Sequence, residues 1–326
     1  MNKRPNRSLG SSGIEVSPLA LGGNVFGWTV LDESTAFSIL DGFVDAGFNF
    51  IDTADVYPMR GDKGTSERMI GNWLRHSGKR DRVVLATKGG NIFAPDKQGL
   101  GRDYLPRAVE ASLQRLGTDR IDLYQSHKDD PETPVEETLE TYAKLIREGK
   151  IRAIGASNFA PDRLFASHAA AAQKGIPGYT ALQPLYNLHD RADFETRLLP
   201  AVQELNLGVL TYLSLAGGFL TGKYRSTDDL AQSARGKRVE RYLDERGFRI
   251  LDALHATAAR LEASPAAVAL AWLIGRPGVT SAIASATRVD QLKVFSEAVR
   301  LRLDGEALAQ LDEASAGRSL TEAVFG

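Results

Sequence analysis

The sequence predicts an α/β protein: a single (β/α)8 TIM barrel over residues 1–326, with an N-terminal β-hairpin and a long loop after the seventh strand. Short apolar, β-rich runs alternate with longer segments of helical period, and eight such units follow one another without a break in composition. Alternation of this kind requires parallel strands, because each helix returns the chain to the same edge of the sheet. Eight parallel units close most simply into a barrel, and 326 residues with 43% hydrophobic side chains suffice to bury its core.

The chain opens with a segment outside this repeat. Residues Arg7–Val16 place Gly10 and Gly13 around a pair of serines, which is typical of a β-hairpin. Eight strands are then expected from their apolar and β-branched composition. Their predicted bounds, in chain order, are Leu19–Gly22, Asn49–Thr53, Val83–Lys88, Ile121–His127, Ile151–Ser157, Ala181–Gln183, Gly208–Tyr212 and Thr280–Ser285.

Segments with helical period fill the intervals between the strands. The first, Glu33–Ala46, repeats apolar residues on one face and ends at Gly47. Acidic residues or proline occupy the first turns of several of these segments, as helix N-termini favour. The other predicted helices are Thr65–His76, Asp103–Leu116, Val135–Arg147 and Pro161–Lys174.

One long stretch, Ala216–Arg238, follows the seventh strand and has little helical period. A loop of this length inside a compact domain usually carries function. An open, doubly wound sheet is the alternative architecture, and a G-x-G-x-x-G motif after the first strand would favour it. The glycines of Gly22–Gly27 have a different spacing and do not open a helix, so we prefer the barrel.

Composition excludes several classes of function. Forty Lys and Arg against 41 Asp and Glu give a formal net charge of −1, so no basic excess favours a nucleic-acid partner. The absence of cysteine excludes disulfides, thiol nucleophiles and iron–sulfur ligation. We expect no membrane association and a cytoplasmic location, because no apolar segment is long enough to span a bilayer and no signal peptide is recognisable.

Four ionisable residues fall at the ends of three successive predicted strands. Asp52 ends the second strand with Tyr57 just beyond it, Lys88 ends the third, and His127 ends the fourth. In a (β/α)8 barrel the carboxyl ends of the strands form the active-site mouth, so these side chains should converge. Each residue alone could be a cap, a packing group or a solvated charge. For the site to be absent, such an explanation would have to hold for all four residues at once, so we favour a shared functional site.

This set fits proton transfer to a carbonyl oxygen. A cationic Lys88 should stabilise the Tyr57 phenolate and lower the pKa of Tyr57 from about 10, so that its hydroxyl exchanges a proton near neutral pH. Asp52 should pair with Lys88, and a neutral His127 could hydrogen-bond the substrate oxygen. Acyl transfer, metal-assisted hydrolysis and glycoside hydrolysis lack their characteristic residue patterns, and we expect no metal. The hydride for such a reaction must come from elsewhere.

Seven segments together resemble the aldo-keto reductase superfamily, in family order from Arg7 to about Val299. The segments are GFNFIDTADVY (47–57), SERMIGNWL (66–74), ATK (86–88), DLYQSH (122–127), GKIRAIGASNF (149–159), LQPLYN (182–187) and GGFLTGKY (217–224). The resemblance implies a barrel that reduces aldehydes and ketones with NADPH and without a metal. It also implies that Asp52, Tyr57, Lys88 and His127 are the catalytic tetrad. The sequence of these segments is most similar to that of bacterial members of the family, near the potassium-channel β-subunit-like branch.

The resemblance further implies a binding site for NADPH/NADP+. Ser157, Asn158 and Gln183 would hydrogen-bond the nicotinamide carboxamide, and Tyr212 would stack on its ring, although Ser157-Asn158 alone would also fit a helix cap before Pro161. The remaining implied contacts are Leu213, Ser214, Leu215 and Gly217 in the pyrophosphate loop, Lys223 and Arg235 on the phosphates, and Thr287, Arg288 and Gln291 around the adenosine phosphate. A guanidinium at a helix N-terminus suits a 2′-phosphate, so we expect NADPH over NADH.

Several positions depart from the family pattern. Leu213-Ser214 stands where Ser-Pro is common, Ala284-Ser285 where Pro-Gly is common, and Phe295 where an asparagine is expected to contact adenine. Lys128 follows the catalytic histidine, where many members have tryptophan. Lys128 either faces the pocket and favours an anionic substrate, or it points to solvent. The segment Gly217–Lys223 also imitates a P-loop, but a tyrosine replaces the Ser/Thr that would bind Mg²⁺.

Three functions therefore compete. The first is a carbonyl reductase that acts reversibly on a small carbonyl or alcohol, the second a regulatory subunit that binds nucleotide with little or no turnover, and the third a metal-free lyase or isomerase. The pattern predicts no particular oligomeric state. Polar residues in the first mouth loop, Arg60, Asp62 and Lys63, hint at a polar, sugar-like carbonyl. The loops expected to select the substrate are Pro58–Thr65, Asn91–Arg102, Lys128–Thr133 and the tail Gly317–Gly326.

Overall fold

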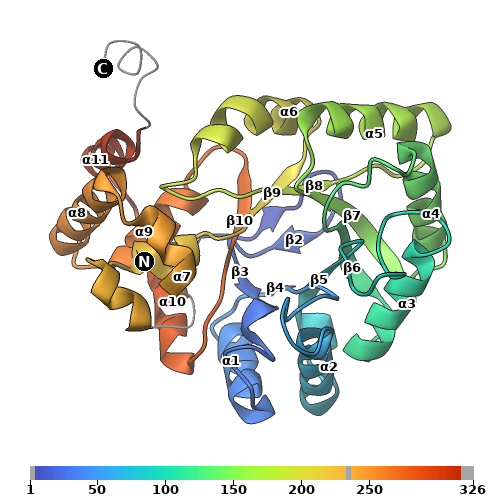
Figure 1. The fold of residues 1–326 in the computed structure, drawn as a ribbon, viewed down its shortest axis with the longest axis horizontal. Helices are drawn as coiled ribbons and strands as arrows, with labels where there is room; N and C mark the ends of the chain where they lie inside the picture. Colours follow the sequence, from blue (N-terminus) through green and yellow to red (C-terminus); the bar gives the residue numbers. More distant parts are fainter. Residues whose placement is uncertain (1–3, 233–235, 317–326) are drawn as a thin grey trace.

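The computed structural model describes residues 4–232 and 236–316 of the chain. Its strands are β1 (Arg7–Ser8), β2 (Glu15–Val16), β3 (Leu19–Gly22), β4 (Phe50–Asp52), β5 (Val84–Gly89), β6 (Ile121–Ser126), β7 (Ile151–Ser157), β8 (Ala181–Gln183), β9 (Gly208–Thr211) and β10 (Val279–Ala284). Eight of them are parallel and close into a barrel in the order β10-β3-β4-β5-β6-β7-β8-β9 (Figure 1). The predicted (β/α)8 barrel is confirmed, and each predicted strand agrees with the observed one to within one residue at either end.

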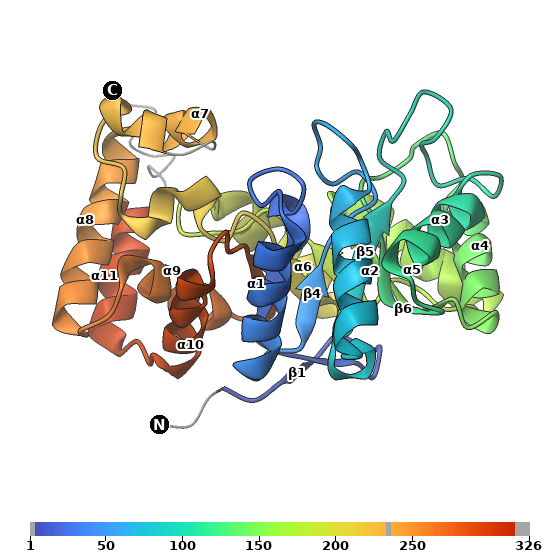
Figure 2. The same ribbon diagram turned by 90° about the horizontal axis from the view of Figure 1, so that it is seen from below.

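The N-terminal hairpin closes the bottom of the barrel. Strands β1 and β2 pair antiparallel, as predicted, and lie at the end opposite the long βα loops (Figure 2). Leu9 and Val16 of the hairpin belong to the same buried cluster as Phe50 and Leu123 inside the barrel. Gly10 lies so close to the start of β8 that a Cβ there would be 2.2 Å from the carbonyl oxygen of Thr180. The hairpin therefore fills the lower opening and leaves the carboxyl ends of the strands as the open mouth.

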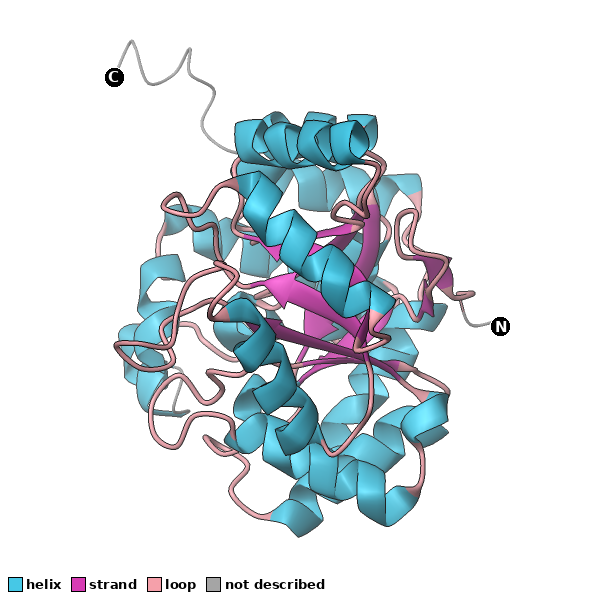
Figure 3. Ribbon diagram, turned by 90° about the vertical axis from the view of Figure 1, so that its right-hand side faces the viewer, coloured by secondary structure: helices cyan, strands magenta, loops and turns pink. Residues whose placement is uncertain are grey.

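Helices surround the strands on the outside, with their apolar faces toward the barrel (Figure 3). Asp32 caps the first of them by accepting a hydrogen bond from Thr35 N, and Asp244 and Ser264 cap α8 (Glu245–Arg260) and α9 (Pro265–Ile274) in the same way. The helices are α1 (Glu33–Asp45), α2 (Thr65–Ser77), α3 (Leu105–Leu116), α4 (Val135–Arg147), α5 (Pro161–Lys174), α6 (Leu199–Glu204), α7 (Gly236–Val239), α8 (Glu245–Arg260), α9 (Pro265–Ile274), α10 (Leu292–Arg300) and α11 (Gly305–Ser315). None of the helices in the described parts of the chain is long and apolar enough to cross a bilayer.

The connection between β9 and β10 is the longest of the barrel. In its described part, the stretch predicted to be irregular contains two short 3₁₀ helices, η4 (Ala216–Thr221) and η5 (Thr227–Gln232), and the start of α7 (Gly236–Val239). A further turn, η6 (Glu240–Tyr242), then leads into α8 and α9. This long connection adds to one side of the mouth, as Figure 1 shows on the left.

Candidate active site

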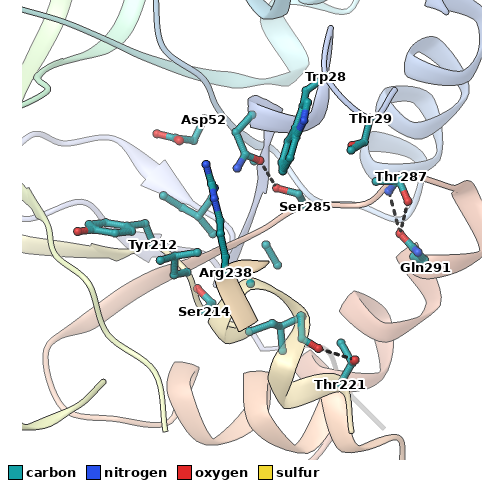
Figure 4. A pocket seen from close by; sticks show the side chains of 18 of the residues that line it. Trp28, Thr29, Asp52, Tyr212, Ser214, Thr221, Arg238, Ser285, Thr287 and Gln291 are labelled. Carbon is teal, nitrogen blue, oxygen red and sulfur yellow. Dashed lines mark hydrogen bonds between the residues drawn. The ribbon is translucent and has the colours of Figure 1, made fainter. Parts of the chain in front are cut away.

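A cavity of about 1140 Å³ opens at the carboxyl ends of the strands. Its wall is formed by the segments that follow β3, β4, β6, β7, β8, β9 and β10, so residues distant in sequence share one space. In Figure 4, Asp52 and Tyr212 lie on one side of this space, and Thr287 and Gln291 lie on the other. The barrel topology therefore brings the residues predicted for catalysis and for cofactor binding to a single mouth.

Asp52 and Lys88 form a buried ion pair beside the cavity. Lys88 Nζ donates to both carboxylate oxygens of Asp52, at 2.8 and 2.7 Å, and to the carbonyl oxygen of Thr53 at 2.7 Å. These three acceptors occupy all three protons of the ammonium group. The side-chain amides of Gln125 and Gln183 donate to Asp52 Oδ1 at 3.2 and 3.0 Å. The expected pair is present, and both of its charges are bonded within the protein.

Tyr57 lies in the loop between β4 and α2, and backbone hydrogen bonds hold its place. Its amide nitrogen donates to the carbonyl oxygen of Ala54 at 3.1 Å, and Ser66 N in the first turn of α2 donates to its carbonyl oxygen at 3.2 Å. The peptide bond between Tyr57 and Pro58 is cis. The start of α2 thus fixes the backbone from which the Tyr57 side chain reaches the cavity.

The expectation that Lys88 lowers the pKa of Tyr57 is wrong. Burial raises the pKa of the phenol, the carboxylates of Asp52 and Asp55 raise it further, and the Arg238 guanidinium opposes them. Lys88 Nζ lies 5.4 Å from the centre of the Tyr57 ring, but Asp52 neutralises its charge at hydrogen-bond distance. Tyr57 is therefore a protonated phenol at neutral pH, which is the form that can donate a proton.

His127 directly follows β6 and faces Tyr57. Its backbone nitrogen donates to the carbonyl oxygen of Gly89 at 2.9 Å, and its ring stands at 87° to the Tyr57 ring with 5.9 Å between centroids. Burial lowers the pKa of His127 to about 3, and the charges of Lys88 and Lys128 act in the same direction. The imidazole is therefore neutral at physiological pH, as the sequence predicts. Its Nδ1 is buried without a partner in the described parts of the chain.

A second buried acid, Asp55, was missed by sequence reasoning. Asp55 is 1% exposed, its backbone nitrogen donates to the carbonyl oxygen of Lys88 at 3.0 Å, and its Oδ1 has no partner among the residues described. Burial raises the pKa of Asp55 to about 8, and the carboxylate of Glu67 adds to this effect. Glu67 is itself bonded to Arg115, with 2.7 Å between Oε2 and Nε. The available signal was the second aspartate of DTADVY, two residues before Tyr57.

The side chains predicted to hold a nicotinamide lie together at the ends of β7, β8 and β9. Ser157 Oγ donates to the carbonyl oxygen of Gln183 at 3.0 Å, and Asn158 Nδ2 donates to Ser157 Oγ at 3.1 Å. The hydroxyl of Tyr212 donates to Asn158 Oδ1 at 2.8 Å. Ala160, without a side-chain hydrogen bond, is the N-cap of α5, so Ser157 and Asn158 do not serve as that cap. The structure brings this predicted group into contact.

The loop after β9 has an unusual backbone. Leu213, Ala216, Gly217 and Gly218 have φ angles of 52°, 50°, 69° and 107°. Left-handed conformations at non-glycine residues cost free energy and cluster at ligand sites. Asn187 Nδ2 holds this loop by donating to the carbonyl oxygen of Leu213 at 3.0 Å. The predicted loop contacts that line the cavity are Leu213, Ser214, Leu215 and Gly217.

Of the two cations predicted for the phosphates, one can be placed. Lys223 lines the cavity, with Nζ 5.0 Å from the centre of the Tyr224 ring. Tyr224, at the position of the P-loop Ser/Thr, is fully buried. Arg235 lies outside the described residues.

The residues predicted around the adenosine phosphate line the opposite end of the cavity. Gln291 Oε1 accepts hydrogen bonds from Thr287 N at 2.8 Å and from Thr287 Oγ1 at 3.4 Å. Arg288 is exposed and bonded to Asp290 through Nε and Nη2, at 3.0 and 3.1 Å. All three predicted residues are therefore near one another, with Arg288 at the surface.

Two departures from the family pattern have a structural explanation. Phe295 is buried and packs edge-to-face against Phe43 and Phe48, with centroid distances of 5.9 and 6.0 Å. This position therefore packs α10 against α1, and Phe295 also forms an apolar part of the cavity wall. Lys128 is exposed and is not part of the cavity wall, which favours the interpretation that it points to solvent.

The polar residues of the first mouth loop serve different purposes. Arg60 lines the cavity, whereas Asp62 forms an exposed ion pair with Arg68. Lys63 Nζ donates to the carbonyl oxygens of Ile92 and Phe93 at 2.7 and 2.9 Å and so ties this loop to the next one. Asp62 and Lys63 therefore no longer support the prediction of a sugar-like substrate, and only Arg60 still does. The tail Gly317–Gly326 lies outside the described residues.

Two cavity residues without a sequence prediction, Trp28 and Arg238, lie against each other. Trp28 comes from the loop between β3 and α1 and Arg238 from α7, and the guanidinium carbon is 5.4 Å from the centre of the indole ring. The pair joins the first βα loop of the barrel to the long β9–β10 connection. The only signals in the sequence were a tryptophan after GGNVFG and a cation at the end of the irregular stretch.

Comparison with known proteins identifies relatives of this chain. The model of the Aldo/keto reductase family matches residues 18–316. The chain is 37% identical over 315 residues to the uncharacterized oxidoreductase YrpG of Bacillus subtilis (strain 168), covering 94% of each chain. It is 33% identical over 302 residues to a probable voltage-gated potassium channel subunit beta of Arabidopsis thaliana, covering 90% of each. It is 31% identical over 318 residues to the norsolorinic acid reductase of Aspergillus flavus, covering 93% of this chain and 79% of that one.

Proposed function

The chain belongs to the aldo/keto reductase family, and on that premise we propose that it catalyses the reversible, NADPH-dependent reduction of an aldehyde or ketone to an alcohol. The observation that supports this most directly is the arrangement of the tetrad. A protonated Tyr57 stands at the cavity beside a neutral His127, and the Asp52–Lys88 ion pair lies behind it.

In the reducing direction Tyr57 donates its proton to the carbonyl oxygen as negative charge develops there. The neutral imidazole of His127 hydrogen-bonds the same oxygen and orients the carbonyl group. The Arg238 guanidinium is the cation that favours the phenolate left on Tyr57, whereas Lys88, 5.4 Å from the ring centre, is held behind the ring by Asp52. When bound, NADPH supplies the hydride that reduces the carbonyl carbon.

The donors and acceptors along the cavity fit such a dinucleotide at both ends. The side-chain amides of Asn158 and Gln183 suit a carboxamide, and Tyr212 offers a ring on which a nicotinamide can stack. At the other end Lys223 and Arg288 supply cations for phosphate groups. Arg288 precedes the turn that leads into α10, a position that favours anions, and this supports NADPH over NADH.

The test is steady-state NADPH oxidation by the purified protein with aromatic, aliphatic and sugar aldehydes, for the wild type and for Tyr57→Phe. We expect the substitution to reduce kcat by about 10²–10⁴-fold, because it removes the proton donor. The dissociation constant for NADPH, measured by fluorescence titration, should stay within about twofold, because the phenylalanine ring occupies the same volume. A Tyr57→Phe protein that turns over at the wild-type rate would refute the assignment.

A nucleotide-binding regulatory subunit is the second candidate, and the 33% identity to a plant channel subunit favours it. That function requires NADPH to bind with no oxidation on any aldehyde of the panel, in the wild type and in Tyr57→Phe alike. The complete tetrad favours the enzyme. Tight NADPH binding without turnover would instead favour the regulatory subunit.

A further inference from the structure

The cavity wall carries an excess of positive charge. Five of its lining residues, within the described parts of the chain, are cations: Arg60, Lys223, Lys237, Arg238 and Arg288. The one carboxylate among those lining residues is Asp52, and Lys88 neutralises it. Lys223 and Arg288 are the cations assigned above to the phosphate groups of a dinucleotide, and this leaves Arg60, Lys237 and Arg238 without an assigned anion.

Arg238 is a cation on the catalytic side of the cavity. In Figure 4 its guanidinium lies on the side of Asp52, while Thr287 and Gln291 lie on the opposite side of the cavity. Its charge also acts on the hydroxyl of Tyr57, where it opposes the increase in pKa that burial causes. Arg238 therefore acts electrostatically on the atom that gives up the proton.

Arg238 is held in position but its charge is not neutralised. The face of the Trp28 ring lies 5.4 Å from the guanidinium carbon, and an aromatic face leaves the N–H groups at the guanidinium edge available. Within residues 4–232 and 236–316 the Arg238 side chain has no hydrogen bond or ion pair. Its neighbour Arg241, in contrast, donates to Asp190 Oδ2 at 3.1 Å. Arg238 is exposed on the surface of α7, and its guanidinium lines the cavity with its N–H groups available to bind an anion.

We propose that Arg238 determines substrate specificity by binding a carboxylate carried by the carbonyl substrate, away from the reacting carbon, with Trp28 positioning the guanidinium. This inference rests on the proposed carbonyl reduction and names its substrate class: aldehydes or ketones that bear a carboxylate. Two parallel N–H···O bonds from the guanidinium fork to the carboxylate orient the substrate. The carbonyl oxygen is then presented to Tyr57 and His127.

The test compares two aldehydes of similar shape, para-carboxybenzaldehyde and para-nitrobenzaldehyde, as substrates of the full-length protein with saturating NADPH. We expect Arg238→Gln to lower the ratio of their kcat/KM values, carboxylate to nitro, at least about tenfold, mainly through KM. A ratio cancels any change common to both substrates. Arg225→Gln is the matched control, because Arg225 lies in the same connection, pairs with Asp252 at 2.8 Å and is not part of the cavity wall. Its ratio should stay within about twofold of the wild type.

Arg238→Lys keeps the charge without the planar fork, so it should recover part of the ratio. An unchanged ratio in Arg238→Gln overturns the inference. A weaker NADPH affinity with an unchanged ratio also overturns it, since Arg238 would then contact the cofactor. Calorimetric titration of para-carboxybenzyl alcohol into the NADP+ complex gives a readout that needs no turnover, and equal affinity in wild type and Arg238→Gln overturns the inference. If the wild type does not turn over either aldehyde but Arg238→Gln binds para-carboxybenzyl alcohol more weakly than the wild type, only the proposed reaction is overturned.

Discussion

The two ends of the cavity are built differently. At the catalytic end a buried ion pair is fully bonded: Lys88 donates to Asp52 and Thr53 with all three of its protons. At the phosphate end Lys223 contacts the ring of the next residue, and Arg288 is bonded to a carboxylate at the surface. The barrel strands hold the first group, whereas the loops after β9 and β10 hold the second.

This difference indicates what each end contributes. Groups that stabilise developing charge work best when folding has already fixed their geometry, because no reorganisation is then needed during the reaction. Groups that bind a charged ligand need donors that are free or held only by an exposed partner, as Arg288 is held by Asp290. Substitutions at the catalytic end should therefore change stability together with rate. Substitutions at the phosphate end should change binding and leave stability close to the wild type.

The largest effect is expected from Lys88→Met, which removes one partner of the buried pair. The carboxylate of Asp52 would remain buried with only amide donors, so we expect a loss of about 3–5 kcal/mol in the free energy of unfolding, together with loss of turnover. Urea unfolding followed by circular dichroism measures the first, and NADPH oxidation measures the second. The double variant Asp52→Asn/Lys88→Met should be more stable than Lys88→Met, because it removes the unpaired charge as well.

Lys79→Met is the matched control for this experiment. Lys79 Nζ pairs with Asp41 at 2.7 Å and with Asp45 at 3.3 Å, but both carboxylates are exposed. The substitution should cost less than about 1 kcal/mol, because water solvates the carboxylates that remain. Equal losses in Lys79→Met and Lys88→Met would contradict the view that the catalytic end is bonded in advance.

A smaller effect, visible only as a function of pH, is expected from Asp55→Asn. The folded protein keeps a proton on Asp55 up to about pH 8, whereas the unfolded chain loses it near the ordinary pKa of 3.8. Between these values the folded state binds more protons, so the free energy of unfolding falls as pH rises, by up to about 1.4 kcal/mol per pH unit. Asp55→Asn removes this pH-dependent part of the free energy of unfolding, so the urea midpoint of the variant should depend less on pH between pH 5 and pH 8.

Asp290→Asn is the control for the pH series. Asp290 is an exposed carboxyl, and the hydrogen bond from Arg288 lowers its pKa, so it is ionised in both states above pH 5. The slope of its stability against pH should match the wild type. If Asp55→Asn has the wild-type slope as well, Asp55 is not the group that holds a proton in the folded protein.

Much of the catalytic end could be predicted from the sequence. Barrel strands are buried on both faces, so they stand out as short apolar runs, and all eight predicted strands agree with the observed ones to within one residue at either end. Because strand ends meet at one mouth, the positions of Asp52, Lys88 and His127 followed from the strands that carry them. The raised pKa of Tyr57 could not be predicted, because it depends on how completely Asp52 neutralises Lys88 in three dimensions.

The β9–β10 connection was harder to predict. Helix α9 is buried at every residue from Ala266 to Ile274, so it has no polar face and therefore no helical period. Asp55, Glu67 and Arg115 meet from three separate segments, and no local pattern indicates that their charges interact. The contact between Trp28 and Arg238 likewise depends on the path of a long connection with little period of its own.

The smallest effect is expected at the phosphate end, from Arg288→Gln. We expect the ratio of KM for NADPH to KM for NADH to rise about tenfold, or about 1.4 kcal/mol, because only NADPH carries the 2′-phosphate that Arg288 would bind. The urea midpoint should not change measurably, since the pair with Asp290 is exposed. Asp290→Asn should shift the same ratio in the opposite direction by freeing the guanidinium. An equal rise in both KM values, or a clear loss of stability, would mean that Arg288 supports the fold of this loop and does not bind the 2′-phosphate. The two ends of the cavity would then not differ in the way argued here.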